Sequence, residues 1–244
     1  MAVDDARRLS SRSLQVSAWH HDAHTVVLNP NPERPAPTPS AISQTIADLR
    51  REGHRRVLTG ALHEHEIGAF LDVGFTVHEK LHLLGHDLRD LPPTAVHPLR
   101  RAWRRDRAGI LAVDALAFDD FWKLDGKGLD AAIRATPTAR SRVLGGRSIR
   151  AYAVTGRAGN RGYIQRLAVH PDHHRQGIGE SLVSDALHWL VRRGVHQALV
   201  NTQERNEGAF ALYLRCGFEP EPFGLTVLTC DLGPAGTGGS VVVP

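Results

Sequence analysis

The segment Gln176-Gly177-Ile178-Gly179-Glu180 has the residue types and spacing with the clearest chemical meaning in this sequence, because its two glycines stand where a helix begins. The first N–H groups of a helix have no partner within it, and the helix dipole places about half a positive charge there. Glycines let the backbone turn sharply and let a phosphate approach without meeting a Cβ atom. A strand leading into such a turn would form a cradle for a diphosphate. Taken alone, two glycines in an ordinary strand-to-helix turn explain the segment equally well.

Two common phosphate-binding patterns do not fit this loop. The dinucleotide fingerprint GxGxxG fails because Leu182 stands where its third glycine belongs, and the Walker loop GxxxxGK[ST] is absent from the chain. The loop is therefore not predicted to serve either of those folds.

The elements around the loop must position it. Residues 161–169 are rich in strand formers and end at Pro171, which has no N–H for a continuing strand. After the loop, apolar residues recur at three- and four-residue spacing, which predicts an amphipathic helix that ends near Gly194. These apolar residues are Ile178, Leu182, Val183, Ala186, Leu187 and Leu190.

A second strand and helix follow. Residues 198–202 predict a short strand, and Asn206 is the expected N-cap of a helix through Leu214, closed by Gly217. Upstream we expect helices over 109–121 and 130–135 and a hairpin of strands 148–155 and 162–169. This alternation predicts an α/β fold with a mixed sheet.

Composition narrows the class of protein. Of the 244 residues 41% are hydrophobic and 23% charged, and the formal net charge is only +4, which favours a globular protein with a real core and an anionic ligand over a dedicated nucleic-acid binder. Two cysteines exclude a disulfide framework and a four-thiolate zinc site. With no long apolar run and no apolar leader, we expect a cytoplasmic protein without membrane contact.

An internal repeat is expected from residues that recur at an offset of 143. Val57, Thr59, Gly74 and Phe75 match Val200, Thr202, Gly217 and Phe218. In the first copy the loop before the helix, residues 29–40, holds five prolines and no glycine. The predicted organisation is a degenerate half-repeat at 14–88 without the phosphate loop, a linker at 89–96, a catalytic domain at 97–232 and a disordered tail at 233–244.

Two stretches together resemble the GNAT superfamily of N-acetyltransferases. Arg166-Leu-Ala-Val-His-Pro171 followed by Arg175-Gln-Gly-Ile-Gly179 resembles its acetyl-CoA-binding segment, and Asn206-x-x-Ala209-x-x-Leu212-Tyr213-x-x-x-Gly217-Phe218 resembles its second signature. His174 departs from the Gln or Arg usual at the first position of the loop, and its contribution to phosphate binding would depend on pH. The resemblance is firm over 162–232 and implies the GNAT fold with a splayed central sheet, preceded here by the partial repeat.

The resemblance also implies which residues bind acetyl-CoA. The backbone of Leu167, Ala168 and Val169 would hold the pantetheine arm, and an N–H there would point at the thioester oxygen, a contact worth about 3 kcal/mol when the oxygen becomes negative. The pyrophosphate would lie against His174, Arg175, Gln176, Gly177, Ile178, Gly179 and Glu180. Asn206 would contact the cofactor arm.

The implied activity is transfer of an acetyl group from acetyl-CoA to a primary amine, by direct attack in a ternary complex. Tyr213 would lie near the sulfur and act as general acid, since a phenol keeps its proton at neutral pH; otherwise it is a tyrosine packed in the core. The corresponding residue of the first copy is Phe70, which has no proton to give.

The general base is left unassigned. A lysine-like amine must lose a proton, which costs about 4 kcal/mol at pH 7.4. Tyr163 and Gln165 stand where some relatives carry a glutamate, and neither is a base. Glu204 is the nearest carboxylate, with a solvated loop position as its other explanation. The alternative function is a non-catalytic acyl-CoA-binding or regulatory module.

Other signals are set aside. His78, His82 and His86 would lie along one solvated strand face over about 27 Å, too far apart to share a metal ion, so no metal is expected. The arginines of 100–107 are expected to be exposed at the start of the second domain, with no nucleic-acid partner, and Cys216 to be a small buried residue. The acceptor amine, small molecule or protein, and the oligomeric state are open.

Overall fold

The computed structural model describes residues 13–19 and 22–233. Apart from its first residue, the tail predicted to be disordered (233–244) lies outside the described residues. Within them, no helix is long and apolar enough to cross a membrane.

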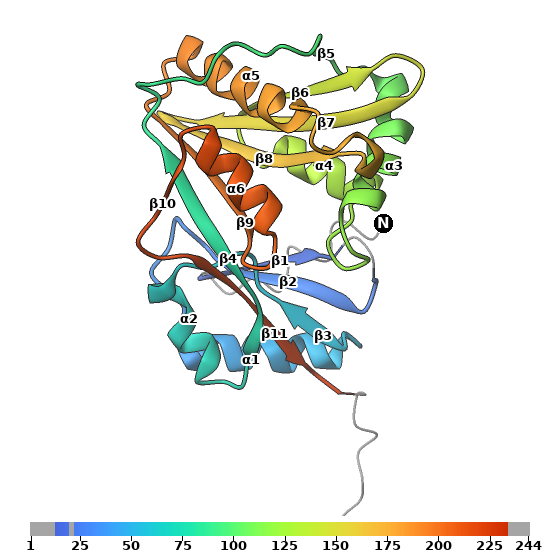
Figure 1. Cartoon of the computed structure of the whole chain (residues 1–244). Helices are drawn as coiled ribbons and strands as arrows, with labels where there is room; N and C mark the ends of the chain where they lie inside the picture. Colours follow the sequence, from blue (N-terminus) through green and yellow to red (C-terminus); the bar gives the residue numbers. More distant parts are fainter. Residues whose placement is uncertain (1–12, 20–21, 234–244) are drawn as a thin grey trace, which may run out of the picture. The chain divides into compact units, whose positions relative to one another are not determined.

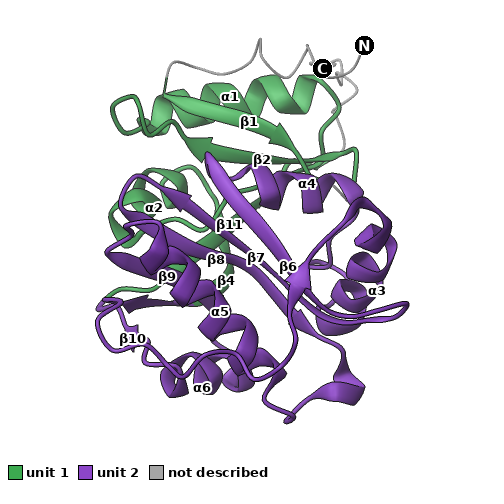
Figure 2. Cartoon of the chain, turned by 90° about the horizontal axis from the view of Figure 1, so that it is seen from above, with its two compact units in different colours: residues 1–81, 223–244 green, residues 82–222 purple. Residues whose placement is uncertain are grey.

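The chain forms two compact units, coloured separately in Figure 2. The first comprises residues 1–81 and 223–244, and the second comprises residues 82–222. The sequence predicts a linker at 89–96 and a catalytic domain at 97–232 that includes the last strand. The compact units divide differently because that last strand pairs with two strands of the first unit.

The first unit is a sheet with strand order β1-β2-β3-β11-β4. Strands β2 and β3 are parallel, and the other neighbours are antiparallel. Its elements are β1 (Leu14–Ala18), β2 (Thr25–Pro30), α1 (Pro39–Arg51), β3 (Arg56–Leu58), α2 (Glu64–Leu71), the first part of β4 (Thr76–His86) and β11 (Leu225–Asp231). Its core includes Ile42, Leu49, Val57, Phe70 and Leu228, all fully buried.

The second unit continues from the end of β4 with the order β4-β9-β8-β7-β6-β5, and β10 also pairs with β4 (Figure 1). Its strands are β5 (Arg100–Arg101), β6 (Thr138–Gly145), β7 (Ile149–Ala158), β8 (Arg161–Val169), β9 (Gln197–Gln203) and β10 (Glu219–Pro220). Its helices are α3 (Arg107–Ala117), α4 (Gly126–Arg134), α5 (Ile178–Arg192) and α6 (Glu207–Arg215). The helices and the hairpin expected from sequence are present, with ends that differ by a few residues.

Alternation along β7 explains how helices cover both faces of this sheet. Successive side chains of a strand point to opposite faces. Tyr152 and Val154 pack with α3 and α4, whereas Ala151 and Ala153 pack with α5. All four residues are buried, so β7 lies between two apolar layers.

A β-bulge shapes the central strand β8. Thr155 pairs with Ile164 while its neighbour Val154 pairs with Arg166, so Gln165 is an extra residue on β8. A bulge bends the strand and increases its twist. Pairing of β8 with β9 ends at Tyr163, two residues before the bulge. Beyond this point β8 keeps its partner β7 and has no ladder partner on the β9 side.

The repeat stays a prediction. Each proposed copy holds a parallel strand pair, β2 with β3 and β8 with β9, and the matched glycines Gly74 and Gly217 both have left-handed φ angles, 92° and 87°.

The prediction of a solvated histidine face is wrong for His86. The three histidines lie on β4 as expected, but His86 is 3% exposed and its ring packs edge-on against Phe218, because the end of β4 lies beneath α6 and the segment that follows it. Burial lowers the pKa of His86. Among the described residues, no three His, Cys, Asp or Glu side chains gather as a metal site requires.

A buried carboxylate joins α3 to the sheet. Asp114 is fully buried and accepts two hydrogen bonds from Arg166 of β8, at 2.7 and 2.9 Å. The Tyr152 hydroxyl donates to the same carboxylate, and burial raises the pKa of Tyr152, which keeps it a donor. The charge is thus paired and fully hydrogen-bonded, which is the condition under which a buried ion is tolerated.

Replacing the buried carboxylate should be costly. Asp114→Asn removes its charge with little change of shape and leaves the Arg166 guanidinium unneutralised, so we expect the free energy of unfolding to fall by about 3–5 kcal/mol in urea denaturation. The matched control is Asp130→Asn, whose partly exposed pair with Arg107 should be worth at most about 1 kcal/mol. Equal losses in the two variants would contradict the proposed importance of the buried pair.

Candidate functional site

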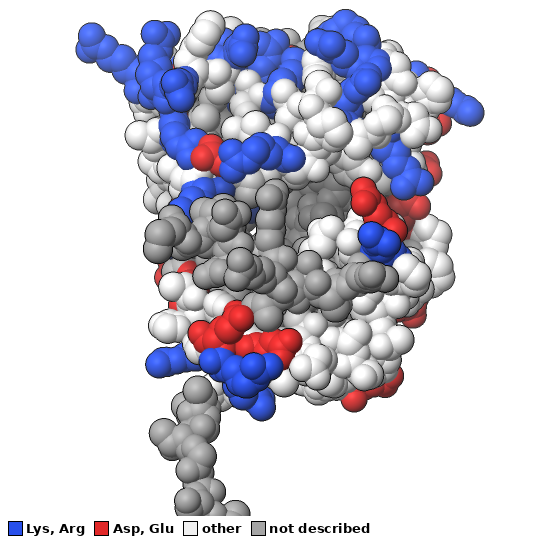
Figure 3. All heavy atoms as spheres, turned by 180° about the vertical axis from the view of Figure 1, so that it is seen from behind, with Lys and Arg blue, Asp and Glu red and all other residues white. Residues whose placement is uncertain are grey.

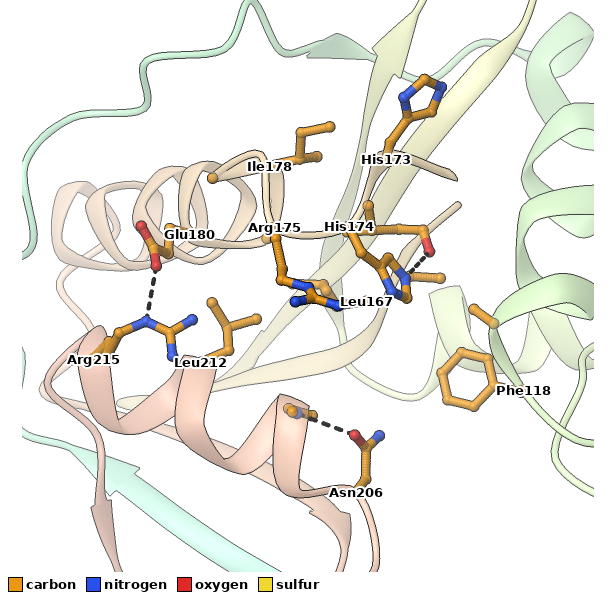
Figure 4. A pocket seen from close by; sticks show the side chains of 17 residues that line it. Phe118, Leu167, His173, His174, Arg175, Ile178, Glu180, Asn206, Leu212 and Arg215 are labelled. Atoms are coloured by element: carbon orange, nitrogen blue, oxygen red, sulfur yellow. Dashed lines mark hydrogen bonds and ion pairs between the residues drawn. The ribbon is translucent and has the colours of Figure 1, made fainter. Parts of the chain in front are cut away.

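An open cavity of about 700 Å³ lies where β8, the loop after it, the start of α5 and α6 converge (Figure 4). Ten of the twelve residues predicted to bind the coenzyme line it: Leu167, Ala168, Val169, His174, Arg175, Gly177, Ile178, Gly179, Glu180 and Asn206. The structure therefore brings together three segments that are separate in the sequence.

One wall of the cavity is the free edge of β8. Leu167 and Val169 pair with Ala153 and Ala151 of β7 on one side only. On the other side the N–H and C=O groups of this stretch face the cavity instead of a strand. Such an edge can accept an extended ligand as an added strand.

The loop that follows β8 turns the backbone toward the start of α5. After a 3₁₀ turn at Pro171–His173, Arg175 and Gly177 adopt left-handed φ angles of 57° and 73°. Gly177 is the N-cap of α5, and the first bond of the helix runs from Ser181 N–H to its carbonyl. The N–H groups of residues 178–180 are thus the unpartnered first donors of the helix, a ready anion site.

A residue from outside the motif supports this loop. The His97 Nε2 donates to the carbonyl oxygen of Gln176 at 2.8 Å, which fixes the tautomer of its ring. The backbone N–H of His97 also contacts Ser181 Oγ at 3.4 Å. No sequence signal pointed to His97, because its role depends on a contact across 79 residues.

The charges around the cavity are uneven. Glu180 of α5 pairs with Arg215 of α6 at 2.9 Å, so the single carboxylate among the described lining residues is neutralised. Arg175 also lines the cavity (Figure 4). Together with the start of α5, this leaves the cavity positive, as a phosphate ligand requires.

His174 contacts the free edge itself. Its Nε2 lies 3.0 Å from the carbonyl oxygen of Val169, as the dashed line in Figure 4 shows. His174, which replaces the usual Gln or Arg, therefore places an imidazole at the end of β8. An amide of an incoming ligand would compete with it for the Val169 carbonyl.

Asn206 caps α6 as expected from sequence. Its side-chain oxygen accepts a hydrogen bond from the N–H of Ala209 at 3.0 Å. Because the oxygen is used in this cap, the amide nitrogen is the group left to contact a ligand.

Two predicted residues do not line the cavity. Gln176 contributes its carbonyl to His97, and Tyr213 is 5% exposed and packs against Phe218, with ring centres 5.6 Å apart. Burial raises the pKa of Tyr213, so its hydroxyl keeps its proton. The acid role of Tyr213 stays a prediction, and Glu204 is exposed and outside the cavity lining.

Sequence reasoning missed the wall formed by the end of α3. Ala117 and Phe118 line the cavity, and the Arg166 guanidinium lies 3.3 Å from the centre of the Phe118 ring. The buried pair of Arg166 with Asp114 thus supports this wall from behind. The other missed lining residues are His173, Gly208, Ala209, Leu212 and Arg215; Ala209 and Leu212 belong to the motif, whose spacing places them on the face of α6 that carries Asn206.

Curated relatives are similar over short segments. The chain is 37% identical over 71 residues to aminoglycoside N(6')-acetyltransferase type 1 of Klebsiella aerogenes, covering 29% of this chain and 47% of that protein. It is 34% identical over 68 residues to the ribosomal protein bS18 alanine N-acetyltransferase of Escherichia coli, covering 28% and 46%. The chain therefore spans about half the length of these relatives.

Solved structures show the same fold over nearly the whole chain. A tandem GNAT protein from the clavulanic acid biosynthesis pathway superposes with a TM-score of 0.67 at 14% identity, covering 91% of this chain and 79% of that one. A GCN5-related N-acetyltransferase from Kribbella flavida gives a TM-score of 0.62 at 17% identity, covering 94% and 92%.

The family model described as the acetyltransferase (GNAT) family matches residues 96–218, which is half of the chain and includes all the residues of the cavity. The splayed sheet, the loop at the start of α5 and this match lead to one conclusion: the chain belongs to the GNAT family of acetyltransferases.

Proposed function

We propose that this protein transfers an acetyl group from acetyl-CoA to a primary amine. The observation that carries the proposal is the continuity of the free edge of β8 with the unpartnered N–H groups of α5 in one cavity. An extended amide-bearing arm with a diphosphate at its end is the ligand chemistry that such a surface matches.

The cavity fits this cosubstrate in size and charge. A volume of about 700 Å³ lies within the range of sites for small molecules and cofactors. Gly179 and Leu212 both line the cavity, and a Cβ at Gly179 would lie 2.9 Å from the Leu212 side chain, so the site has little room for a larger residue there. The N–H groups of residues 178–180 and Arg175 would hold the diphosphate.

The free edge of β8 would stabilise the negative charge that develops on the thioester oxygen during the reaction. A backbone N–H near Leu167 is fixed by the ladder with β7, so it needs no reorganisation when the thioester oxygen becomes negative. Acetyl-CoA supplies the acetyl group, and the attacking amine displaces the thiolate. Tyr213 is the residue of α6 that we propose to protonate the leaving sulfur.

The lining favours amines that lose a proton easily. Glu180 is the single carboxylate among the described lining residues, and its carboxylate is paired with Arg215. The amine must then lose its proton to water. An α-amine, with a pKa near 8, reaches the neutral form at about 3 kcal/mol less cost than a lysine, so we propose α-amines or other amines of low pKa as acceptors.

The same observations favour one alternative. Tyr213 is buried and outside the cavity lining, and no unpaired carboxylate is among the lining residues that the structure describes. Both are what a non-catalytic acyl-CoA-binding module would show. Titration with coenzyme A, followed by thiol release over a panel of amines, separates the two functions. Binding without turnover on any amine would favour the module, and absence of binding would exclude both.

A large side chain at Gly179 should occupy the cavity and abolish coenzyme binding. We expect Gly179→Leu to weaken the affinity for coenzyme A by at least about a hundredfold, or about 2.7 kcal/mol, in isothermal titration calorimetry. The matched control is Gly146→Leu, in the exposed turn between β6 and β7, where a Cβ meets nothing within 4 Å. Normal affinity in Gly179→Leu would contradict the cradle.

Removing the phenolic hydroxyl should affect turnover and not binding. Tyr213→Phe should lower kcat by about a hundredfold and leave KM for acetyl-CoA unchanged, because the hydroxyl acts on the leaving sulfur. Because burial raises the pKa of Tyr213, wild-type kcat should show no decline at alkaline pH from loss of its proton. Tyr163→Phe on β8 is the control. Equal rates for Tyr213→Phe and the wild type would remove the acid role.

The preference among acceptor amines should follow how easily each amine loses its proton. Without a carboxylate base, kcat/KM for a lysine side chain should rise about tenfold per pH unit from pH 7 to 9, whereas that for a peptide α-amine should level off near pH 8. Initial rates on one peptide with either its α-amine or its lysine blocked would measure this. Parallel profiles for the two amines would point to a base that the cavity lining does not reveal.

A further inference from the structure

A second cavity, of about 470 Å³, lies elsewhere in the second unit and shares no lining residue with the coenzyme cavity. It is lined by the end of α4, by β5 and β6, and by the last turns of α5. Its charged and aromatic lining residues are Arg101, Arg140, Arg142, Arg193 and Trp189. We call it the arginine groove.

The charges in the arginine groove do not balance. Four arginine side chains line it, and no carboxylate is among its described lining residues. Asp185 of α5, which is not among the described lining residues, accepts hydrogen bonds from both Arg140 and Arg142. One carboxylate thus serves two guanidinium groups, and the other lining arginines add to the excess positive charge.

Arg140 is the most buried of the four arginines that line the groove. Its side chain is 18% exposed, and its Nε is buried without a hydrogen-bond partner. Burial lowers the pKa of Arg140 to about 10. The Asp185 carboxylate opposes this shift, and the charges of Arg142 and Arg192 add to it. A buried donor without a partner is costly, and an anion in the groove would offset the excess positive charge around it.

Trp189 forms a rigid wall of the groove. It is 7% exposed, and the guanidinium groups of Arg140 and Arg193 lie 5.0 and 5.7 Å from its ring centre. Such cation–π contacts keep the two guanidinium groups beside the groove.

The surroundings extend this positive field. Figure 3 shows Lys and Arg side chains gathered over the end of the second unit where Figure 1 places β5, β6 and β7. Clustered charge of one sign raises the local concentration of anions and guides them to a concave site.

From this arrangement we propose that the arginine groove binds a small anion with two or more negative charges, at a site separate from the coenzyme cavity. Guanidinium groups match phosphate and carboxylate oxygens in paired hydrogen bonds. The groove has the volume of a small-molecule site, and its charge is gathered in a hollow, which favours a phosphorylated or polycarboxylate metabolite over an extended polymer.

The test uses the fluorescence of Trp189 in the full-length chain, titrated with inorganic pyrophosphate in one arm and citrate in the other. We expect a saturable change that also occurs with coenzyme A present and that is absent in Trp189→Phe. In the double variant Arg142→Gln/Arg193→Gln, which keeps the Arg140–Asp185 pair, the dissociation constant should rise at least about tenfold. Tighter binding of pyrophosphate would indicate a phosphorylated ligand, and tighter binding of citrate a polycarboxylate.

A matched variant controls for net charge. Arg147→Gln changes an exposed arginine in the turn between β6 and β7 that does not line the groove, and it should leave both titrations unchanged. The proposal is overturned if neither anion changes the Trp189 signal, if the double variant binds as the wild type does, or if Arg147→Gln weakens binding equally. Because Trp189 reports on the groove, these outcomes do not depend on whether the coenzyme cavity binds coenzyme A.

Discussion

The extra residue in β8 is the constraint on which the site depends. Because Gln165 has no counterpart on β7, the strand bends, and its pairing with β9 ends at Tyr163. A regular strand would keep its ladder and leave no free N–H groups for a ligand. The bend therefore leaves N–H and C=O groups of β8 without partners in the sheet, and a ligand can pair with them. The cavity, the loop and α6 lie around this free edge.

The bulge also accounts for the contact between the core and the cavity wall. With one residue inserted, Gln165 approaches Thr136 near the end of α4, and the next residue, Arg166, reaches Asp114 on α3. The same guanidinium stacks on Phe118, which lines the cavity. A single arginine thus links a buried carboxylate to the surface that a substrate would meet, so the stability of α3 and the shape of the site are coupled.

The sequence predicted most of the second unit because its signals are local. The period of α5, the N-cap Asn206 and the stop at Pro171 each act within a few residues, and each placed its element within a few positions. The contacts that span long separations could not be predicted in this way. The contact of His97 with the loop before α5, Phe118 on the cavity wall and the bulge at Gln165 depend on how distant segments meet, which residue types alone do not encode. The burial of His86 was missed for the same reason, since spacing alone does not show what covers a strand.

The path of the chain gives one more consequence. The first unit is formed from two pieces of sequence, and its strands β4 and β11 are antiparallel neighbours with Leu81 opposite Leu225. The second unit is thus an insertion whose two connections leave from adjacent points of a hairpin. A turn of a few residues from Leu81 to Leu225 would close the first unit without the second. The second unit therefore occupies the position of a hairpin loop, the kind of site at which an inserted domain is tolerated.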